Sequence, residues 1–285
     1  MKRTLPLLAL LTAVPFAQDM DSLLAQAAPA GPVQATFKSI RVVESHSVET
    51  SGKGVLNFVV SHRFGSFGNG PDGGFGLDMA NTRLGLDYGI TDRLDVGLER
   101  SNNEGKPVDL WGKVRLFRQS PDNVMPVSVT WLSAGYLNTQ DPDGLENLPF
   151  SDKLSSVHQL IVARKFSEKL SLQISPTLVQ RSLVVYSDES SISTGVGVAG
   201  RYKLSSRQAL SLDVTQMVTG LHSYDSPSIG LGWDIETGGH VFQLNLVNSG
   251  WLSEDRAYTR GAQSPANFST WSLGFHITRA FDFGS

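Results

Sequence analysis

The chain has 285 residues, a length that suits either one large all-β barrel or a two-domain α/β protein. It contains no cysteine, which excludes disulfides, thiolate metal sites, cysteine nucleophiles and cysteine-linked lipid anchors. Charged residues make up 18% of the sequence and glycine occupies 28 positions, a profile typical of β-sheet proteins, while the net charge of −3 offers no basic surface to nucleic acid. No apolar run reaches the roughly 18 residues that a transmembrane helix needs.

Residues 1–17 are predicted to form a signal peptide. Two basic residues precede an apolar stretch over 5–16, which is too short to cross a bilayer and has the length of a signal-peptide hydrophobic region. We place the cleavage after Ala17, with later alanines as alternative sites and a buried N-terminal helix as the alternative interpretation. The chain is therefore expected to be exported, and residues 18–52, which show no sustained period, are predicted to be a periplasmic lead-in segment near or inside the periplasmic mouth.

From residue 53 onward the dominant pattern has period two, with apolar residues on one side and small or charged residues on the other. In the clearest run, Leu84 and Leu86 alternate with Arg83 and Asp87. Two of the predicted strands, the fifth and the sixth, alternate poorly. The twelve predicted strands cover residues 53–64, 79–90, 94–101, 108–118, 126–137, 155–166, 170–181, 192–204, 209–218, 228–237, 240–249 and 269–283.

The connections between these strands alternate in length. Long ones, such as residues 138–154, are followed by tight turns such as Gly238-Gly239, and only residues 119–125 depart from the rule. Outer-membrane barrels have this arrangement, with short periplasmic turns and longer extracellular loops. The predicted fold is therefore all-β: an antiparallel up-and-down transmembrane β-barrel of about 12 strands over residues 53–285. A secreted β-sandwich or a small soluble ligand-binding barrel is the alternative.

Turn lengths assign the two faces of the strands, because residues opposite each other in a hairpin point the same way. Pairing Ile90 with Leu94, and Thr237 with His240, places apolar residues together on one side, which must face lipid if the barrel spans a membrane. Four arginines on that side, at 100, 118, 164 and 279, lie near strand ends, where long side chains reach the headgroups. The lumen-lining candidates on the opposite side are Arg83, Asp87, Asp95, Glu99, Asp109, Lys113, Arg115, Arg201, Lys203, Asp213, Asp234, Glu236 and His276.

Several segments resemble a known family of uncharacterised proteins. They include the stretch from Leu84 to Leu94, the stretch from Ala163 to Gln173 and the stretch from Asp234 to Leu244. These segments are similar to the family named domain of unknown function 5777, which is regarded as an outer-membrane β-barrel family. The resemblance implies the barrel fold and an outer-membrane location, and it implies no activity and no site residues.

Inward charges of both signs can line a water-filled channel or form a salt-bridge network that closes a narrow lumen. A narrow channel for small solutes is the leading hypothesis, and a structural barrel with a closed lumen is the alternative. An outer-membrane lipid hydrolase is a third hypothesis, because His276 shares a strand face with Ser272. The two are four residues apart on an extended strand, roughly 13 Å, which is beyond hydrogen-bond reach. We therefore expect that the protein is not an enzyme.

No cofactor or metal is expected. The run Asp141-Pro142-Asp143-Gly144 resembles part of a calcium loop, but the ligand pattern is incomplete and an ordinary turn is favoured. Outer-membrane lipid and the barrel-assembly machinery are the expected partners, with small solutes as candidate cargo and no nucleic acid. The expected location is the bacterial outer membrane.

Overall fold

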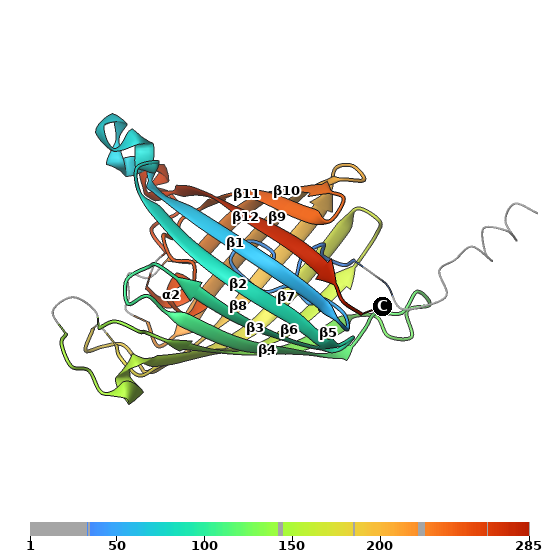
Figure 1. The fold of residues 1–285 in the computed structure, drawn as a ribbon, viewed down its shortest axis with the longest axis horizontal. Coiled ribbons are helices and arrows are strands. Elements are labelled where there is room, and N and C mark those ends of the chain that lie inside the picture. The colour runs from blue at the N-terminus through green and yellow to red at the C-terminus, as the bar shows by residue number, and fades with distance from the viewer. Residues whose placement is uncertain are drawn as a thin grey trace, which may run out of the picture. The chain divides into compact units, whose positions relative to one another are not determined.

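The computed structural model describes residue 33 and residues 35–141, 145–184, 186–221, 226–260 and 262–284. Within these residues, twelve strands form one closed barrel in which each strand pairs with its neighbours in the sequence and β1 closes on β12 (Figure 1). All the pairings are antiparallel. The predicted fold class is confirmed. The predicted signal peptide and the first part of the predicted lead-in segment lie outside the described residues.

The strands begin and end close to the predicted positions, and short helices lie in the long connections. The strands are β1 (Val55–Ser66), β2 (Ala80–Thr91), β3 (Leu94–Ser101), β4 (Val108–Phe117), β5 (Ser128–Leu137), β6 (Leu154–Lys165), β7 (Leu170–Arg181), β8 (Ile192–Lys203), β9 (Gln208–Thr219), β10 (Ser228–Thr237), β11 (His240–Val247) and β12 (Ser272–Asp282). The helices are η1 (Phe67–Asn69), η2 (Pro71–Gly76), η3 (Phe150–Lys153), α2 (Glu254–Thr259) and η4 (Phe268–Thr270). None of the helices in the described residues is long and apolar enough to cross a membrane.

The apolar side of the wall faces outward. In β7, Gln173 and Ser175 are buried, whereas Leu172 and Ile174 are 43% and 49% exposed. A water-soluble barrel or sandwich buries its apolar side, so this polarity is the reverse of the soluble alternative. It is the arrangement of a barrel whose outer surface contacts lipid.

Of the two predicted hairpin pairings, one is correct and the other needs a correction at its turn. Thr237 pairs with His240 as predicted. In the β2–β3 hairpin, however, the predicted pairing of Ile90 with Leu94 is wrong, because Leu94 pairs with Thr91 and a bulge follows. The extra residue in the bulge restores the predicted parity further along both strands.

A second bulge changes the environment of Arg118, which was predicted to face outward. The β4–β5 register shifts after Arg115, and this shift turns the following residues around. The Arg118 guanidinium consequently points into the barrel mouth, where its Nε donates to the carbonyl oxygen of Val33 over 2.8 Å. A second guanidinium nitrogen lies 3.6 Å from the Glu49 carboxylate.

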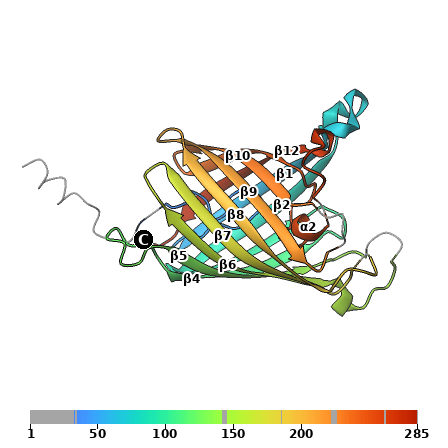
Figure 2. The ribbon, with the colours of Figure 1, turned by 180° about the vertical axis from the view of Figure 1, so that it is seen from behind.

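Two segments occupy the inside of the barrel. Residues 35–52, which we call the plug segment, lead directly into β1. They lie inside the barrel, toward the end that carries the short turns (Figure 1). Residues 248–260, which we call the inward loop, follow β11 and contain α2. Figure 2 shows α2 at the end of the barrel opposite to the C-terminus, where the long loops lie.

The plug segment explains why two strands alternate poorly in the sequence. Its buried residues Val42, Val43 and Val48 belong to the same apolar cluster as Leu132 in β5 and Ile161 in β6. These two strands therefore carry apolar residues on both sides, one facing lipid and the other facing the cluster that includes the plug segment.

Candidate functional site

The plug segment doubles back on itself inside the lumen. Arg41 and His46 form an antiparallel bridge, and the N–H of Ser47 donates to the carbonyl oxygen of Ile40 over 2.8 Å. Most backbone groups of so short a hairpin have no partner within it. Because a buried backbone group without a partner is costly, the barrel wall must supply the missing hydrogen bonds.

One side of the wall supplies them from β4. Lys113 is fully buried, and its Nζ donates to the carbonyl oxygens of Ile40, Ser47 and Glu49 at distances of 3.0, 3.1 and 2.9 Å. Asp95 is paired with Lys113 in the β3–β4 register and accepts from the N–H of Ser51 over 2.6 Å. A single ammonium group thus holds three carbonyl oxygens of the plug segment.

The other side of the wall holds the turn of the hairpin. Asp213 of β9 accepts from the backbone N–H groups of Glu44 and Ser45 at 3.0 and 2.7 Å, and from the Ser45 hydroxyl at 2.8 Å. Glu44 in turn lies 2.5 Å from the guanidinium of Arg63, which is fully buried in β1. Further along the plug segment, the side-chain amide of Gln173 in β7 accepts one hydrogen bond from a backbone N–H and donates another to a backbone carbonyl oxygen.

A cluster of charges joins the plug segment to the inward loop. Arg41 lies 2.5 Å from Glu99 and also forms an ion pair with Glu254. Arg83 contacts Glu99, Asp109 and Glu254 at 2.5, 2.8 and 3.4 Å. All five side chains are at least nine-tenths buried, so they attract one another with little screening by water.

Glu254 occupies the centre of this cluster. The Tyr136 hydroxyl donates to it over 2.8 Å, in addition to its contacts with Arg41 and Arg83. Burial alone would raise the pKa of Glu254, but the two guanidinium groups hold that pKa at about 2. Glu254 is therefore ionised at neutral pH, and it links the inward loop to the plug segment and to the wall.

The structure places nine of the thirteen sequence-predicted residues in three groups. Arg83, Glu99 and Asp109 lie in the charge cluster, and Asp95, Lys113 and Asp213 hold the plug segment. Nearer the short-turn end, Arg201 lies 3.2 Å from Glu236 and 3.8 Å from Asp234. Of the remaining four, Arg115 also contacts the plug segment, because it donates to Thr50. Asp87 is buried, Lys203 is half-buried, and His276 contacts Ser61 over 2.7 Å.

Sequence reasoning missed the partners of these residues. Arg41 and His46 lie in a segment with no periodicity, and Glu254 lies in a long connection, so nothing in the pattern placed them in the lumen. The position of Arg63 could have indicated such a partner, because Arg63 is on the same lumen-facing side of β1 as Ser61. A buried arginine on a lumen-facing strand position requires an acid from another segment, and that acid is Glu44.

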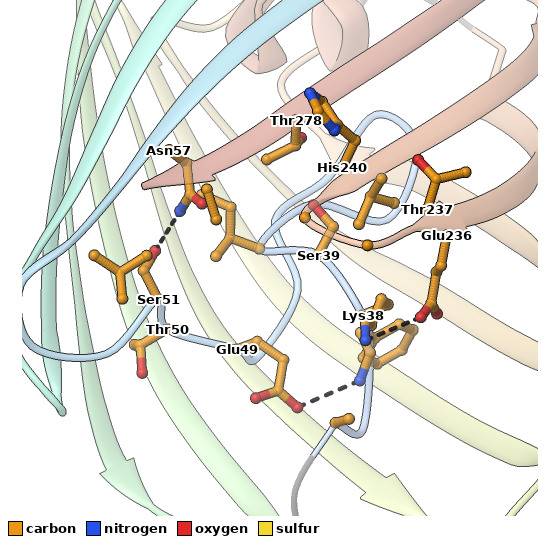
Figure 3. Close-up of a pocket in the computed structure, with 18 of the residues that line it drawn as sticks. Lys38, Ser39, Glu49, Thr50, Ser51, Asn57, Glu236, Thr237, His240 and Thr278 are labelled. Atoms are coloured by element: carbon orange, nitrogen blue, oxygen red, sulfur yellow. Dashed lines mark hydrogen bonds and ion pairs between the residues drawn. The ribbon is translucent and has the colours of Figure 1, made fainter. Parts of the chain in front are cut away.

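A cavity of about 750 Å³ lies beside the plug segment at the short-turn end (Figure 3). Lys38 and Glu236 form an ion pair across it at 2.9 Å, and the Asn57 amide donates to the Ser51 hydroxyl over 2.7 Å. The plug segment therefore fills the middle of the barrel but leaves an open vestibule at this mouth.

Two other predicted sites can be compared with the described residues. Asp141 of the calcium-like run lies 2.5 Å from the Lys153 ammonium, while the other three residues of that run are outside the described residues. In the described ranges, no group of three or more acidic or histidine side chains could hold a metal ion. His276 contacts Ser61 of the neighbouring strand, so the serine nearest to it is not Ser272.

Acidification is expected to loosen the plug segment through His46. Burial, together with the charges of Arg41, Lys113 and Arg83, lowers the pKa of His46 well below its ordinary value, although Glu254 lies 3.5 Å away. In a released segment the ring has a pKa of about 6.5. The released form therefore takes up the proton first. The free energy that holds the plug segment inside the barrel is thus greatest above pH 6.5 or so, and it falls by about 1.4 kcal/mol for each pH unit below that value.

The measurement is amide hydrogen exchange of the plug segment at pH 7.5 and pH 5.5, after correction for the intrinsic pH dependence. We expect about tenfold less protection at the lower pH in the wild type. His46→Gln removes the titrating ring, so a pH dependence of equal size in that variant would assign the effect to other groups.

A comparison with protein families identifies the chain. Residues 37–281 match the family named domain of unknown function 5777, described as a membrane-bound beta barrel domain. The chain belongs to this family. Because the family is membrane-bound, the outward apolar side of the twelve-stranded wall contacts lipid, and the polar lumen described above lies within a membrane.

Several solved barrels have a similar form at low identity. The NanC porin is 9% identical, with 80% of this chain and 98% of that chain covered and a TM-score of 0.49. The CymD monoaromatic hydrocarbon channel is 9% identical over 87% and 99% of the two chains, with a TM-score of 0.41. Outer membrane phospholipase A from Escherichia coli is 10% identical over 80% and 90%, with a TM-score of 0.38. These similarities assign no cargo and no activity to the chain, and no curated protein matches it.

Proposed function

We propose that the protein is a gated channel for small solutes in the bacterial outer membrane, which the plug segment holds closed. The proposal includes export through a cleaved signal peptide, partnership with outer-membrane lipid and the barrel-assembly machinery during insertion, and no catalytic step. In the described conformation, the plug segment and the inward loop meet at Glu254 and occupy the middle of the lumen. Passage of a solute therefore requires that the plug segment move.

The observation that carries the proposal is the chemistry of the contact between plug and wall. The wall contacts the plug segment through charged and amide side chains, such as Lys113, Asp213 and Gln173, as well as through apolar ones. A lumen closed permanently by its own side chains needs no separate segment. Once this segment leaves, the same polar groups line an aqueous path and can be solvated by water.

The vestibule supports the same function. It brings water to the short-turn side of the plug segment. The side chains of Lys38 and Glu236, which form an ion pair there, are 43% and 17% exposed. Exposed ion pairs contribute at most about 1 kcal/mol, so this end of the plug segment is held more weakly than the buried hairpin. Release is expected to start here.

A reversible cross-link tests the proposal directly, because the chain has no cysteine of its own. A Cβ atom added at Gly230 in β10 would lie 3.0 Å from the Cβ of Val43 in the plug segment. Disulfides have Cβ–Cβ distances of about 3.5 to 4.5 Å, so the pair Val43→Cys and Gly230→Cys needs only a small displacement.

We expect discrete current steps in planar bilayers from a variant that lacks residues 33–52, and rarer steps from the wild type. The oxidised double-cysteine variant should give none, and a reductant should restore the wild-type frequency, with each single-cysteine variant as the matched control. If the deletion variant folds, as judged by heat-modifiable migration, and still gives no steps, the channel proposal fails. The closed-lumen structural barrel is then the function that the geometry supports.

A further inference from the structure

The plug segment places a guanidinium group between carboxylates that belong to the rest of the barrel. The two terminal nitrogens of Arg41 contact different acids, Glu99 of β3 at 2.5 Å and Glu254 of the inward loop. A guanidinium is a planar fork of N–H donors, whereas an ammonium is a compact point charge. Two carboxylates on separate nitrogens of one fork therefore make a place that is shaped for a guanidinium.

The first carboxylate is held in position by the wall as well as by Arg41. Glu99 accepts from the indole N–H of Trp111 over 2.9 Å and lies 2.5 Å from Arg83 Nε. Its side chain crosses Gly85 of β2, where an added Cβ atom would come within 2.9 Å of it. A glycine at this position therefore leaves the room that Glu99 needs, and the wall keeps this acid in place without the plug segment.

The second carboxylate also has partners in the wall. Tyr136 of β5 donates its hydroxyl to Glu254 over 2.8 Å, and a guanidinium nitrogen of Arg83 lies 3.4 Å from the same carboxylate. Neither contact involves the plug segment. Both acids therefore stay close to their present positions when Arg41 leaves, so a new ligand does not have to order them at its own cost.

A third acid close to this place has no direct partner. Asp87 of β2 is fully buried, and neither of its carboxyl oxygens makes a hydrogen bond with the described residues. The group lies within electrostatic reach of Arg41. A buried carboxyl group that lacks a partner is costly, and a cation beside it lowers that cost. Once water and a mobile cation enter the lumen, Asp87 adds a further negative charge to the same place.

Removing Arg41 leaves an excess of acid here. Arg83 contacts Glu99, Asp109 and Glu254, and it is the cation that remains beside these three carboxylates. In the seated form, Arg41 supplies the second positive charge. Acidic side chains around a pore favour cations, because a passing cation replaces the missing charge. The vacated place is therefore suited to a cation.

Elsewhere in the lumen, departure of the plug segment leaves charges of both signs. Arg63 loses its acid in the plug segment, and Asp213 loses the N–H groups of the hairpin turn. Lys113 loses three carbonyl oxygens, and Asp95 loses one N–H group. These two cations and two acids balance each other, so the excess of acid stays at the place of Arg41.

We propose that the cargo of the channel is a small solute that carries a guanidinium group, and that this group binds between Glu99 and Glu254 in the place of Arg41. The inference rests on the proposed function, because the solute reaches this site when the plug segment moves. Arg41 and the solute compete for the same carboxylates. A ligand that binds only the released form shifts the equilibrium toward release, so the cargo favours the opening of its own channel.

The first experiment measures block of the variant that lacks residues 33–52 in planar bilayers. Potassium chloride carries the current, and methylguanidinium chloride is compared with ethylammonium chloride, whose cation has the same charge without the fork. We expect methylguanidinium to interrupt the current at about tenfold lower concentration. Glu99→Gln in the same background should remove this difference, and Glu168→Gln, in an exposed turn, should retain it. Equal block by the two cations overturns the inference while the channel proposal stands.

The second experiment follows the plug segment in the full chain, so it depends neither on current nor on a variant that folds. Amide hydrogen exchange of residues 36–48 is measured at equal concentrations of the two salts. If methylguanidinium binds only the released form, the concentration that doubles the exchange rate should, when raised tenfold, make exchange about elevenfold faster. Exchange in β7 and β8 should not change.

The two experiments separate the two proposals. If the deletion variant gives no current, the channel proposal fails and hydrogen exchange alone decides whether the site binds a guanidinium. If the two salts have the same effect on exchange of the plug segment, the inference is overturned whether or not the barrel conducts.

Discussion

Lys113→Met is expected to release the plug segment while the barrel stays closed. The substitution keeps the length of the side chain but removes a donor to the carbonyl oxygens of Ile40, Ser47 and Glu49, and among the described contacts only the Ile40 oxygen keeps another donor, a backbone N–H. Each buried carbonyl that loses its only donor costs about 1 to 3 kcal/mol, so with two such carbonyls the seated form loses about 2 kcal/mol or more. The twelve-stranded ladder is unaffected, because Lys113 contributes to it only through its backbone.

The measurement is amide hydrogen exchange of residues 36–48, which should become at least about thirtyfold faster, together with more frequent current steps in planar bilayers. Lys169→Met is the control, because that lysine lies exposed in the β6–β7 turn. Exchange in Lys113→Met that matches the control would mean that the apolar contacts alone hold the plug segment in place.

Glu254→Ala is expected to loosen both segments inside the barrel at once. Without this carboxylate, Arg41 retains only Glu99 as a close acid, and Arg83 loses one of its three. Breaking a buried pair by removing one partner costs about 3 to 5 kcal/mol, because the remaining charge stays buried without compensation. Glu254→Gln retains the shape and one acceptor oxygen, so we expect a smaller effect from it.

Hydrogen exchange distinguishes this coupling from a local effect. We expect faster exchange in the plug segment and in α2 alike, whereas Glu168→Ala in an exposed turn should change neither. If α2 exchanges faster and the plug segment does not, the two segments are independent and the inward loop has no part in holding the lumen closed.

The wall could be predicted from the sequence because successive residues of a strand in a membrane barrel must alternate between lipid-facing and lumen-facing types. Each residue of β2 or β10 faces either lipid or lumen, so period two and turn length together determine both strand ends and register. The two errors, at Ile90 and at Arg118, both come from bulges, which insert a residue without changing the local composition.

The contents of the lumen could not be predicted in the same way. The plug segment has no regular secondary structure, and its hydrogen bonds go to residues more than sixty positions away, such as Lys113 and Asp213. Single residues such as His46 have no periodic partner that would reveal them. The poor alternation of β5 and β6 was the one indication of the plug segment in the sequence, because it reflected lumen-facing apolar residues that this segment covers.

The ion pair of Arg41 with Glu254 spans 213 positions of the chain and has a consequence for the order of assembly. The plug segment is synthesised before any strand, yet its contact with Glu254 can form only after the connection between β11 and β12 has been made. Contacts of such high sequence separation form late in folding. The earliest synthesised segment of the described barrel therefore completes its contacts only after one of the last connections has been made.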